Sequence, residues 1–211
     1  MEVIKLMVSE VFVSYQGEGR YVGYPMVFVR LAGCNLKCRW CDTKYAWDIE
    51  KAKKLDPMQV SQLVLERNVE YVCLTGGEPM VQRDEVMELL RYLKWGNRKV
   101  HLETNGTIDF DERRFDYVVV SPKSVDVLEK WWFRDVDLKL VVGRDDWDMW
   151  KEALLNCFEM GRRIGRIYVM PRGRTNKELM ENFKGFYEDL LESFGEMVLV
   201  SPRMQVQYGV P

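Results

Sequence analysis

The chain has 211 residues, enough for one domain whose core needs no disulfide or metal to be stable. Hydrophobic residues make up 47% and charged residues 30%, which is typical of a globular protein and excludes a disordered one. The 31 basic and 33 acidic side chains leave a net charge of −2, so no basic excess indicates nucleic-acid binding. No apolar run reaches the ~20 residues of a membrane span, and no signal-peptide pattern opens the chain. We therefore expect a cytoplasmic protein with no nucleic-acid or membrane partner.

Short β-type runs alternate along the chain with longer segments of helical period. After a β-type segment over 7–15, strands are expected at 26–31, 71–74, 99–103, 117–120, 138–142, 166–170 and 197–200. Several of these runs are apolar throughout, which indicates strands that are covered on both faces of a parallel sheet.

The segments between the strands carry helix signals. Asp56 and Pro57 offer an N-cap and a first-turn proline for one helix, and Gly96 marks the end of the next. Two later helices are expected over 145–160 and 176–193. This alternation predicts an α/β fold with parallel strands and right-handed crossovers, in which functional residues gather at the carboxyl ends of the strands.

Three of the five cysteines stand within eight residues, just after the expected strand 26–31. Cys34, Cys38 and Cys41 have the spacing C-x3-C-x2-C, which favours metal binding over disulfide formation. Thiolates are the usual ligands of iron–sulfur clusters, and three of them leave one iron of a [4Fe–4S] cluster open. Cys73 and Cys157 are interpreted as buried small hydrophobes.

A structural zinc site is the alternative interpretation of the three cysteines. Such a site needs a fourth ligand, and the one histidine, His101, lies far along the chain inside an expected strand. We interpret His101 as a packed strand residue, which favours the iron–sulfur hypothesis.

The cysteine spacing resembles that of the radical S-adenosylmethionine (radical SAM) superfamily, and Thr75–Pro79 resembles its glycine-glycine-glutamate-proline motif. Further motifs stand in order along the chain: Ser14–Gly19, Phe28–Gly33, Cys41–Thr43, Glu103–Thr107, Ser121–Lys123 and Ser201–Arg203. Together they resemble the 7-carboxy-7-deazaguanine synthase family of the 7-deazapurine pathway, which leads to queuosine and archaeosine.

The resemblance implies an incomplete parallel (β/α)6 barrel of the radical SAM type, formed by a single domain over 1–211. It implies a lyase that uses a [4Fe–4S] cluster, S-adenosylmethionine and Mg²⁺. The implied substrate is 6-carboxy-5,6,7,8-tetrahydropterin. An adenosyl radical removes the hydrogen at C6, the ring contracts and ammonia leaves.

The resemblance also implies site residues. Cys34, Cys38 and Cys41 would hold the cluster, and Thr43 would bind Mg²⁺. The expected contacts to S-adenosylmethionine are Trp40, Cys41, Asp42, Gly77, Ser121, Pro122 and Lys123. The expected substrate contacts are Tyr15, Gln16, Gly17, Arg30, Thr75 and the terminal Pro211. Arg30 is costly to bury in an apolar strand unless it is paired, and a substrate carboxylate would pair it bidentately.

One position departs from the family pattern, because Gln205 stands where the family often has a histidine. An amide can donate and accept hydrogen bonds but does not titrate near neutral pH, so the hydrogen bonding of the substrate is left open. An electron donor of the flavodoxin or ferredoxin type is expected, and a homodimer is left open. A glycyl-radical-activating enzyme and a non-catalytic zinc-binding protein remain the alternative functions.

Overall fold

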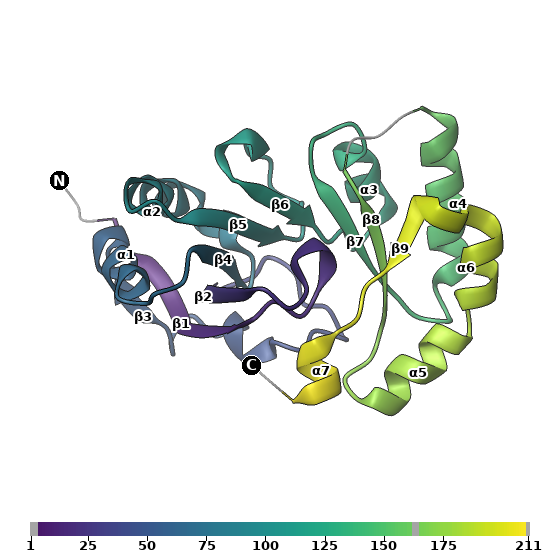
Figure 1. The fold of residues 1–211 in the computed structure, drawn as a ribbon, viewed down its shortest axis with the longest axis horizontal. Helices are drawn as coiled ribbons and strands as arrows, with labels where there is room; N and C mark the ends of the chain where they lie inside the picture. Colours follow the sequence, from purple (N-terminus) through teal and green to yellow (C-terminus); the bar gives the residue numbers. More distant parts are fainter. Residues whose placement is uncertain (1–3, 162–164, 210–211) are drawn as a thin grey trace. The chain divides into compact units, whose positions relative to one another are not determined.

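The computed structural model describes residues 4–161 and 165–209 (Figure 1). By its internal contacts the chain divides into two compact units. Unit 1 comprises Met1–Gln16, Gly23–Thr104 and Ile108–Val118, and unit 2 comprises Gly17–Val22, Asn105–Thr107 and Val119–Pro211. Each unit is described below by itself.

Unit 1 contains a sheet with the strand order β3-β1-β2-β4-β5. Its strands are β1 (Leu6–Tyr15), β2 (Pro25–Leu31), β3 (Lys53–Leu55), β4 (Tyr71–Gly76) and β5 (Lys99–Thr104). Its helices are α1 (Pro57–Leu65) and α2 (Arg83–Trp95), with short 3-10 helices η2 (Lys44–Trp47), η3 (Pro79–Gln82) and η4 (Glu112–Arg114). Strands β2, β4 and β5 are parallel, whereas β1 runs antiparallel to both β2 and β3.

The two faces of this sheet differ in character, because successive side chains of a strand point to opposite faces. One face carries only apolar side chains in its centre, among them Val29, Leu74 and Leu102, which are fully buried. On the other face Phe28 of β2 is aligned with Cys73 of β4, and Cys73 with His101 of β5. This second face becomes polar toward the carboxyl ends of the strands, and we call it the polar face.

The helices of unit 1 begin where the sequence indicates. Asp56 caps α1 in a capping box: its side chain accepts from the Gln59 amide at 2.8 Å, and Gln59 Oε1 accepts from the Asp56 amide at 3.0 Å. The apolar stripe of α2 is buried, and α1 and α2 lie next to each other in Figure 1. These helices bury the apolar stripes that the 3.6-residue period predicts.

Unit 2 contains the parallel strand order β6-β7-β8-β9. Its strands are β6 (Tyr117–Val120), β7 (Asp137–Val142), β8 (Ile167–Pro171) and β9 (Val198–Val200), with the first two residues of β6 counted in unit 1. Its helices are α3 (Val125–Trp131), α4 (Trp147–Glu159), α5 (Asn176–Lys184), α6 (Tyr187–Phe194) and α7 (Met204–Tyr208), with the 3-10 helices η1 (Gly19–Tyr21) and η5 (Gly195–Met197).

Aromatic side chains form much of the core of unit 2. Trp147 stacks on Phe186 with ring centroids 5.2 Å apart, and Trp132 packs edge-on against Phe158 at 5.0 Å. The interpretation of Trp131, Trp132, Trp147 and Trp150 as core residues is confirmed, because each is at most 3% exposed.

The predicted elements agree with the structure except at four places. The single helix expected over 176–193 is wrong: α5 ends at Lys184, Gly185 caps it, and α6 begins at Tyr187. Three elements were not predicted: β3, α3 and α7. The apolar content of Lys53–Leu55 is too low to indicate a strand, and β3 is paired to β1 through the backbone alone.

Among the described residues, no helix combines the length and apolar character that crossing a membrane requires.

Candidate active site

The three clustered cysteines lie on the loop that leaves β2, which we call the cysteine loop (residues 32–43). Gly33 opens it with a φ of +88°, a conformation that favours glycine, and its amide donates to the Ala46 carbonyl at 2.7 Å. At its centre the Cys41 amide donates to the Cys38 carbonyl at 3.2 Å. The loop therefore leaves the sheet in a turn fixed at one end by η2.

The glycines after β4 pack directly against this loop. The Gly77 amide donates to the Leu31 carbonyl at 2.9 Å, and the Glu78 amide donates to the Gly33 carbonyl at 2.8 Å. A Cβ at Gly77 would lie 1.9 Å from the Gly33 oxygen and 3.1 Å from the Cys34 Cβ. Only glycine fits at position 77, so the Thr75–Pro79 motif and the cysteine loop are packed together as one structural element.

Gln82 of η3 ties the base of the loop to β1, a role that the sequence did not predict. Its Nε2 donates to the Ala32 carbonyl at 2.9 Å, and its Oε1 accepts from the Met7 amide at 2.6 Å. Glu78 is also fully buried and accepts from the Thr104 hydroxyl at 2.7 Å. These buried hydrogen bonds hold the start of the cysteine loop against three strands of unit 1.

The donor set on this loop fits an iron–sulfur cluster. Cys34, Cys38 and Cys41 form no disulfide and are half-exposed. Burial raises the pKa of Cys34, an effect to which the neighbouring Glu78, Cys38 and Cys41 add, while a hydrogen bond from the Leu36 amide lowers it. The thiols thus share one electrostatic environment, and a cation bound there would favour their thiolate forms. Among the described residues, no three His, Cys, Asp or Glu side chains stand together as a metal-binding group.

Arg30 lies on the polar face at the carboxyl end of β2, aligned with Glu10 of β1 and Thr75 of β4. Its Nε is 2.7 Å from Glu10 Oε1, which also accepts from the Tyr45 hydroxyl at 2.6 Å. The guanidinium carbon lies 5.3 Å from the Phe12 ring centroid and 5.9 Å from that of Tyr45. Burial and the bond to Glu10 raise the pKa of Tyr45 to about 12, so its hydroxyl stays protonated. Arg30 is therefore held through Nε, and the structure describes no partner for its two terminal amino groups.

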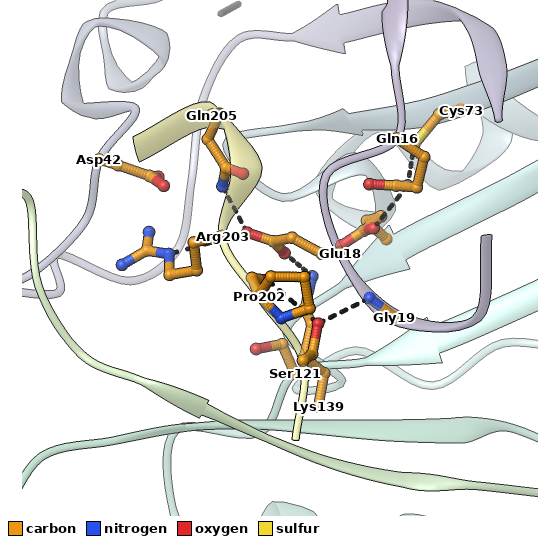
Figure 2. A network of polar contacts seen from close by, with 12 residues as sticks. Gln16, Glu18, Gly19, Asp42, Cys73, Ser121, Lys139, Pro202, Arg203 and Gln205 are labelled. Carbon is orange, nitrogen blue, oxygen red and sulfur yellow. Dashed lines mark hydrogen bonds and ion pairs between the residues drawn. The ribbon is translucent and has the colours of Figure 1, made fainter. Parts of the chain in front are cut away.

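Gln16 belongs to the same face of unit 1. Its Nε2 donates to Glu103 Oε1 at 3.2 Å. The same atom lies 4.0 Å from Cys73 Sγ, and Figure 2 shows Gln16 beside Cys73. Gln16 is only 6% exposed, whereas Glu103 is half-exposed. Glu103 and Glu10 were not predicted as site residues, although Glu103 opens a motif at the end of an expected strand.

The remaining predicted residues of unit 1 lie in different surroundings. The Thr43 hydroxyl donates to Asp42 Oδ1 at 3.0 Å at the exposed end of the cysteine loop, and Trp40 is half-buried there. Tyr15 is 61% exposed. A side-chain role of Tyr15 toward a substrate stays a prediction.

Unit 2 contains the other predicted residues. Lys123 Nζ donates to the Ser121 carbonyl at 2.7 Å and lies 2.6 Å from its hydroxyl, so Ser121–Lys123 forms a closed turn after β6. A Cβ at Gly17 would lie 2.7 Å from Gln205 Oε1, which explains a glycine at this position. Pro211 lies outside the described residues.

A buried polar network in unit 2 surrounds Glu18, and Figure 2 shows it at close range. Glu18 is hydrogen-bonded to Lys139 and to Gln205, and Arg203 Nε lies 3.8 Å from its Oε1. Lys139 and Arg203 are at most 5% exposed. Gln205 thus binds a carboxylate as a neutral donor, and its partner could not be predicted from the sequence.

The interpretations of three other residues are confirmed. Cys73 and Cys157 are fully buried, and burial raises the pKa of Cys157 to about 11. His101 is 2% exposed and packs edge-on between Tyr71 and Tyr117. Burial lowers the pKa of His101 to about 4, with Asp116 opposing and Lys99 reinforcing the shift, so the ring is neutral.

Comparison with known proteins agrees with this geometry. Residues 28–184 match the sequence model of the radical SAM superfamily. A 7-carboxy-7-deazaguanine synthase of Hyperthermus butylicus is 38% identical over 197 residues, covering 83% of this chain and 82% of the relative. The synthase of Methanospirillum hungatei is 47% identical over 110 residues, which span 51% of this chain and 45% of that relative.

The crystal structure of QueE from Escherichia coli covers 93% of this chain and 93% of that chain, with a TM-score of 0.69 and 23% identity. This likeness confirms the predicted fold class, an incomplete parallel α/β barrel of the radical SAM type. The family match covers more than half of the chain, and the Hyperthermus relative is similar along most of both lengths. The chain therefore belongs to the radical SAM superfamily and, within it, to the 7-carboxy-7-deazaguanine synthase family.

Proposed function

We propose that the chain converts 6-carboxy-5,6,7,8-tetrahydropterin into 7-carboxy-7-deazaguanine, a step of 7-deazapurine biosynthesis. The proposal rests on one observation: the chain belongs to a family whose members are named 7-carboxy-7-deazaguanine synthase. Membership of this family also favours the ring contraction over a glycyl-radical-activating enzyme and over a zinc-binding protein. The substrate is a small molecule, and the reaction needs a reductant.

The cofactors of the superfamily are a [4Fe–4S] cluster and S-adenosylmethionine. The three thiols of the cysteine loop would hold the cluster, which supplies the electron that cleaves S-adenosylmethionine. Gly77 lets the backbone after β4 approach the cysteine loop closely, and Gly77 is proposed to line the cosubstrate site. Trp40, Asp42 and, from unit 2, Ser121–Lys123 are the remaining proposed contacts to S-adenosylmethionine.

Arg30 is the proposed anchor of the substrate carboxylate. Its Nε is held by Glu10, and its ring contacts fix the plane of the guanidinium. The terminal amino groups can then form the two parallel hydrogen bonds that a carboxylate accepts best.

Polar groups of unit 1 would position the rest of the pterin. Gln16 and Glu103 offer an amide and a carboxylate within hydrogen-bonding distance of each other, a pair that can both donate and accept. Thr75 of β4 is aligned with Arg30 of β2 and is a further proposed substrate contact. The other proposed substrate contacts are Tyr15, Gly17 and Pro211.

Magnesium is proposed to bind at the Thr43 hydroxyl. The Thr43 hydroxyl donates its hydrogen to Asp42 Oδ1, so the lone pairs of the Thr43 oxygen can face a cation. A neutral hydroxyl is a weak ligand, so most of the affinity would come from water and from the substrate carboxylate.

The proposal is tested by anaerobic incubation of the reconstituted enzyme with S-adenosylmethionine, dithionite and the carboxypterin. Mass spectrometry should detect 7-carboxy-7-deazaguanine together with 5′-deoxyadenosine. Arg30→Lys should raise KM for the pterin at least about tenfold while cleavage of S-adenosylmethionine without substrate is unchanged, because lysine cannot form the bidentate pair. Cleavage of S-adenosylmethionine by the unaltered enzyme with no consumption of the pterin would exclude this substrate.

We further propose that residues 1–211 act as one radical SAM domain in the cytoplasm, with an electron carrier of the flavodoxin or ferredoxin type as partner. Whether two copies associate is left open.

A further inference from the structure

The segment Gly17–Val22 of unit 2, which we call the η1 loop, has two side chains paired with strand β7. Glu18 is hydrogen-bonded to Lys139. Arg20 donates twice to Asp137, from Nε to Oδ2 at 3.1 Å and from Nη2 to Oδ1 at 2.8 Å. The loop therefore has a carboxylate and a guanidinium two positions apart, and β7 has their opposite charges at the same spacing. Because residues two apart in a strand point to one face, both pairs lie on the same face of β7.

The Arg20–Asp137 pair is the more directional of the two. The Asp137 side chain is 1% exposed, and its Oδ1 also accepts from the Arg166 amide at 2.7 Å. A buried carboxylate is costly unless it is paired and hydrogen-bonded, so Asp137 favours the position of the loop in which Arg20 reaches it. Two parallel hydrogen bonds fix the orientation of the guanidinium as well as its distance.

The backbone of the η1 loop is fastened on its other side to the segment that leads into α7. The Gly19 amide donates to Ser201 Oγ at 2.8 Å, and the Gly17 carbonyl accepts from the Met204 amide at 3.3 Å. Figure 2 shows Gly19 beside Glu18 in this arrangement. Gly19 has a φ of +67°, a conformation that favours glycine and gives the loop little stiffness of its own. Its position therefore depends on these contacts.

Gly17, a proposed substrate contact, is the residue of the loop whose place matters most. A Cβ at Gly17 would lie 2.7 Å from Gln205 Oε1 and 3.3 Å from the Met204 Cβ, so its backbone is packed closely against the start of α7. Asp137 is the first residue of β7, at the amino end of the strand. Functional residues gather at the carboxyl ends of parallel strands, so Asp137 is placed to hold the loop rather than to touch the substrate.

We propose that Arg20 and Asp137 are positioning residues for substrate binding, which hold the η1 loop on β7 and so fix the Gly17 backbone in the pterin site. This inference rests on the proposed function, because it takes Gly17 as a contact of that substrate. Both residues act through the loop. A misplacement of about 1 Å in a positioning group can cost on the order of 10²-fold in rate, so an anchor outside the site can control binding within it.

The test compares substitutions of the pair in the reconstituted holoenzyme. Arg20→Met keeps the length of the side chain and removes its charge, and Asp137→Asn keeps the shape and an oxygen for the Arg166 amide. The double variant completes the cycle. The control is Lys151→Met, which removes another ion pair of unit 2, between Lys151 and Asp189 at 2.5 Å. KM for the pterin is measured beside cleavage of S-adenosylmethionine without pterin, and urea unfolding gives the stability of each variant.

Each single substitution of the pair should raise KM for the pterin at least about tenfold and leave cleavage of S-adenosylmethionine unchanged. The double variant should be no worse than the more affected single variant, because the two residues act through one interaction. Arg20→Lys keeps the charge but not the bidentate geometry, so its KM should lie between those of Arg20→Met and the unaltered enzyme. Lys151→Met should keep the original KM.

Unchanged KM in the folded single variants would overturn the proposal, even if urea unfolding shows lower stability, because that result describes a structural pair alone. Multiplying effects in the double variant would also overturn it, since the residues would then act separately. An equal rise of KM in Lys151→Met would indicate general loosening of unit 2 instead.

The Arg20 side chain is 37% exposed, so the two Arg20 variants carry the test by themselves if Asp137→Asn does not fold. In that case a rise of KM in Arg20→Met that Arg20→Lys partly restores supports the proposal, and an unchanged KM in both contradicts it. No consumption of the carboxypterin by the unaltered enzyme, with S-adenosylmethionine still cleaved, would contradict the proposed function rather than the role of the pair.

Discussion

Arg30 is a charged residue in an apolar strand, and contacts that only the fold provides offset the cost of its burial. Within the strand sequence it is an anomaly, because a charge in an apolar run is costly to bury without a partner. In the fold, Glu10 binds its Nε and two aromatic rings flank it, so the cost is offset before any ligand arrives. Its terminal amino groups are the part of the side chain that the fold leaves for function.

The three cysteines of the loop are expected to be needed for the iron–sulfur cluster, and the two buried cysteines are not. Replacing Cys34, Cys38 or Cys41 with alanine should reduce the iron content from about four per chain to near zero, because a cubane cluster needs all three thiolates. Cys73→Ala and Cys157→Ala are the matched controls and should retain the iron, since both thiols are fully buried in the protein core. Iron analysis after anaerobic reconstitution measures this. Stoichiometric zinc with no uptake of iron would contradict the cluster.

Thr43 is expected to matter for substrate turnover more than for cosubstrate cleavage. Thr43→Ala removes the proposed magnesium ligand, so pterin turnover should fall at least about tenfold and need more Mg²⁺. Thr43→Ser keeps the hydroxyl and should stay near the unaltered enzyme. Turnover is measured over a magnesium titration, with uncoupled S-adenosylmethionine cleavage as the internal reference. An unchanged magnesium response in Thr43→Ala would remove this residue from the metal site.

At the scale of elements, the turn after β4 and the cysteine loop are locked by backbone contacts. The alignment of Leu31 with Gly76 brings these two loops to the same edge of the sheet of unit 1. Gln82 then binds the start of the loop from η3. The geometry of the cysteines is therefore supported by elements that themselves contain no metal ligand.

Gly77→Ala is expected to destabilise this arrangement. Its Cβ would stand 1.9 Å from the Gly33 oxygen, so backbone must move, at a cost of about 1–3 kcal/mol in the free energy of unfolding. Gly96→Ala is the control, because the nearest atoms to its Cβ would be those at the end of the Leu65 side chain, which can rotate away, and its φ of −78° is ordinary. That change should stay within about 1 kcal/mol. Urea unfolding measures the free energy of unfolding of both variants. Equal values would show that the backbone of the cysteine loop moves to accept the Cβ at little cost.

At the scale of the whole molecule, stability should depend on pH through His101. The pKa of His101 is about 4 in the folded protein, against 6.5 for a histidine in an unfolded chain. The unfolded chain therefore binds a proton first as the pH falls. Stability is fully present above pH 6.5 and is lost between pH 6.5 and pH 4, by about 2 kcal/mol at pH 5.

His101→Phe should remove this dependence while preserving the aromatic packing between Tyr71 and Tyr117. Urea unfolding of the two proteins at pH 7.5 and pH 5 gives the comparison. The variant should lose about 2 kcal/mol less than the unaltered protein on acidification. Parallel losses in both would mean that the ring titrates normally in the folded state.

Much of the fold was predictable because its signals are local. Apolar runs of strand length identify β2, β4, β5 and the strands of unit 2, and the capping box begins α1 at its predicted residue. The segment 176–193 was misjudged because its helical period continues through Gly185, where the chain turns. The edge strand β3 was missed because backbone pairing to β1, rather than side-chain burial, stabilises it.

The sequence by itself determined the family, the three-cysteine loop and the candidate residues, since each depends on residue types at short fixed spacings. Tertiary structure alone decided their partners: Glu10 for Arg30, Glu103 for Gln16, and Lys139 and Gln205 for Glu18. These pairs join residues from 20 to 187 positions apart. Between β1 and β2, strand register and the β-bulge between Val8 and Glu10 decide which side chains meet, and a shift of one residue would turn Glu10 away from Arg30.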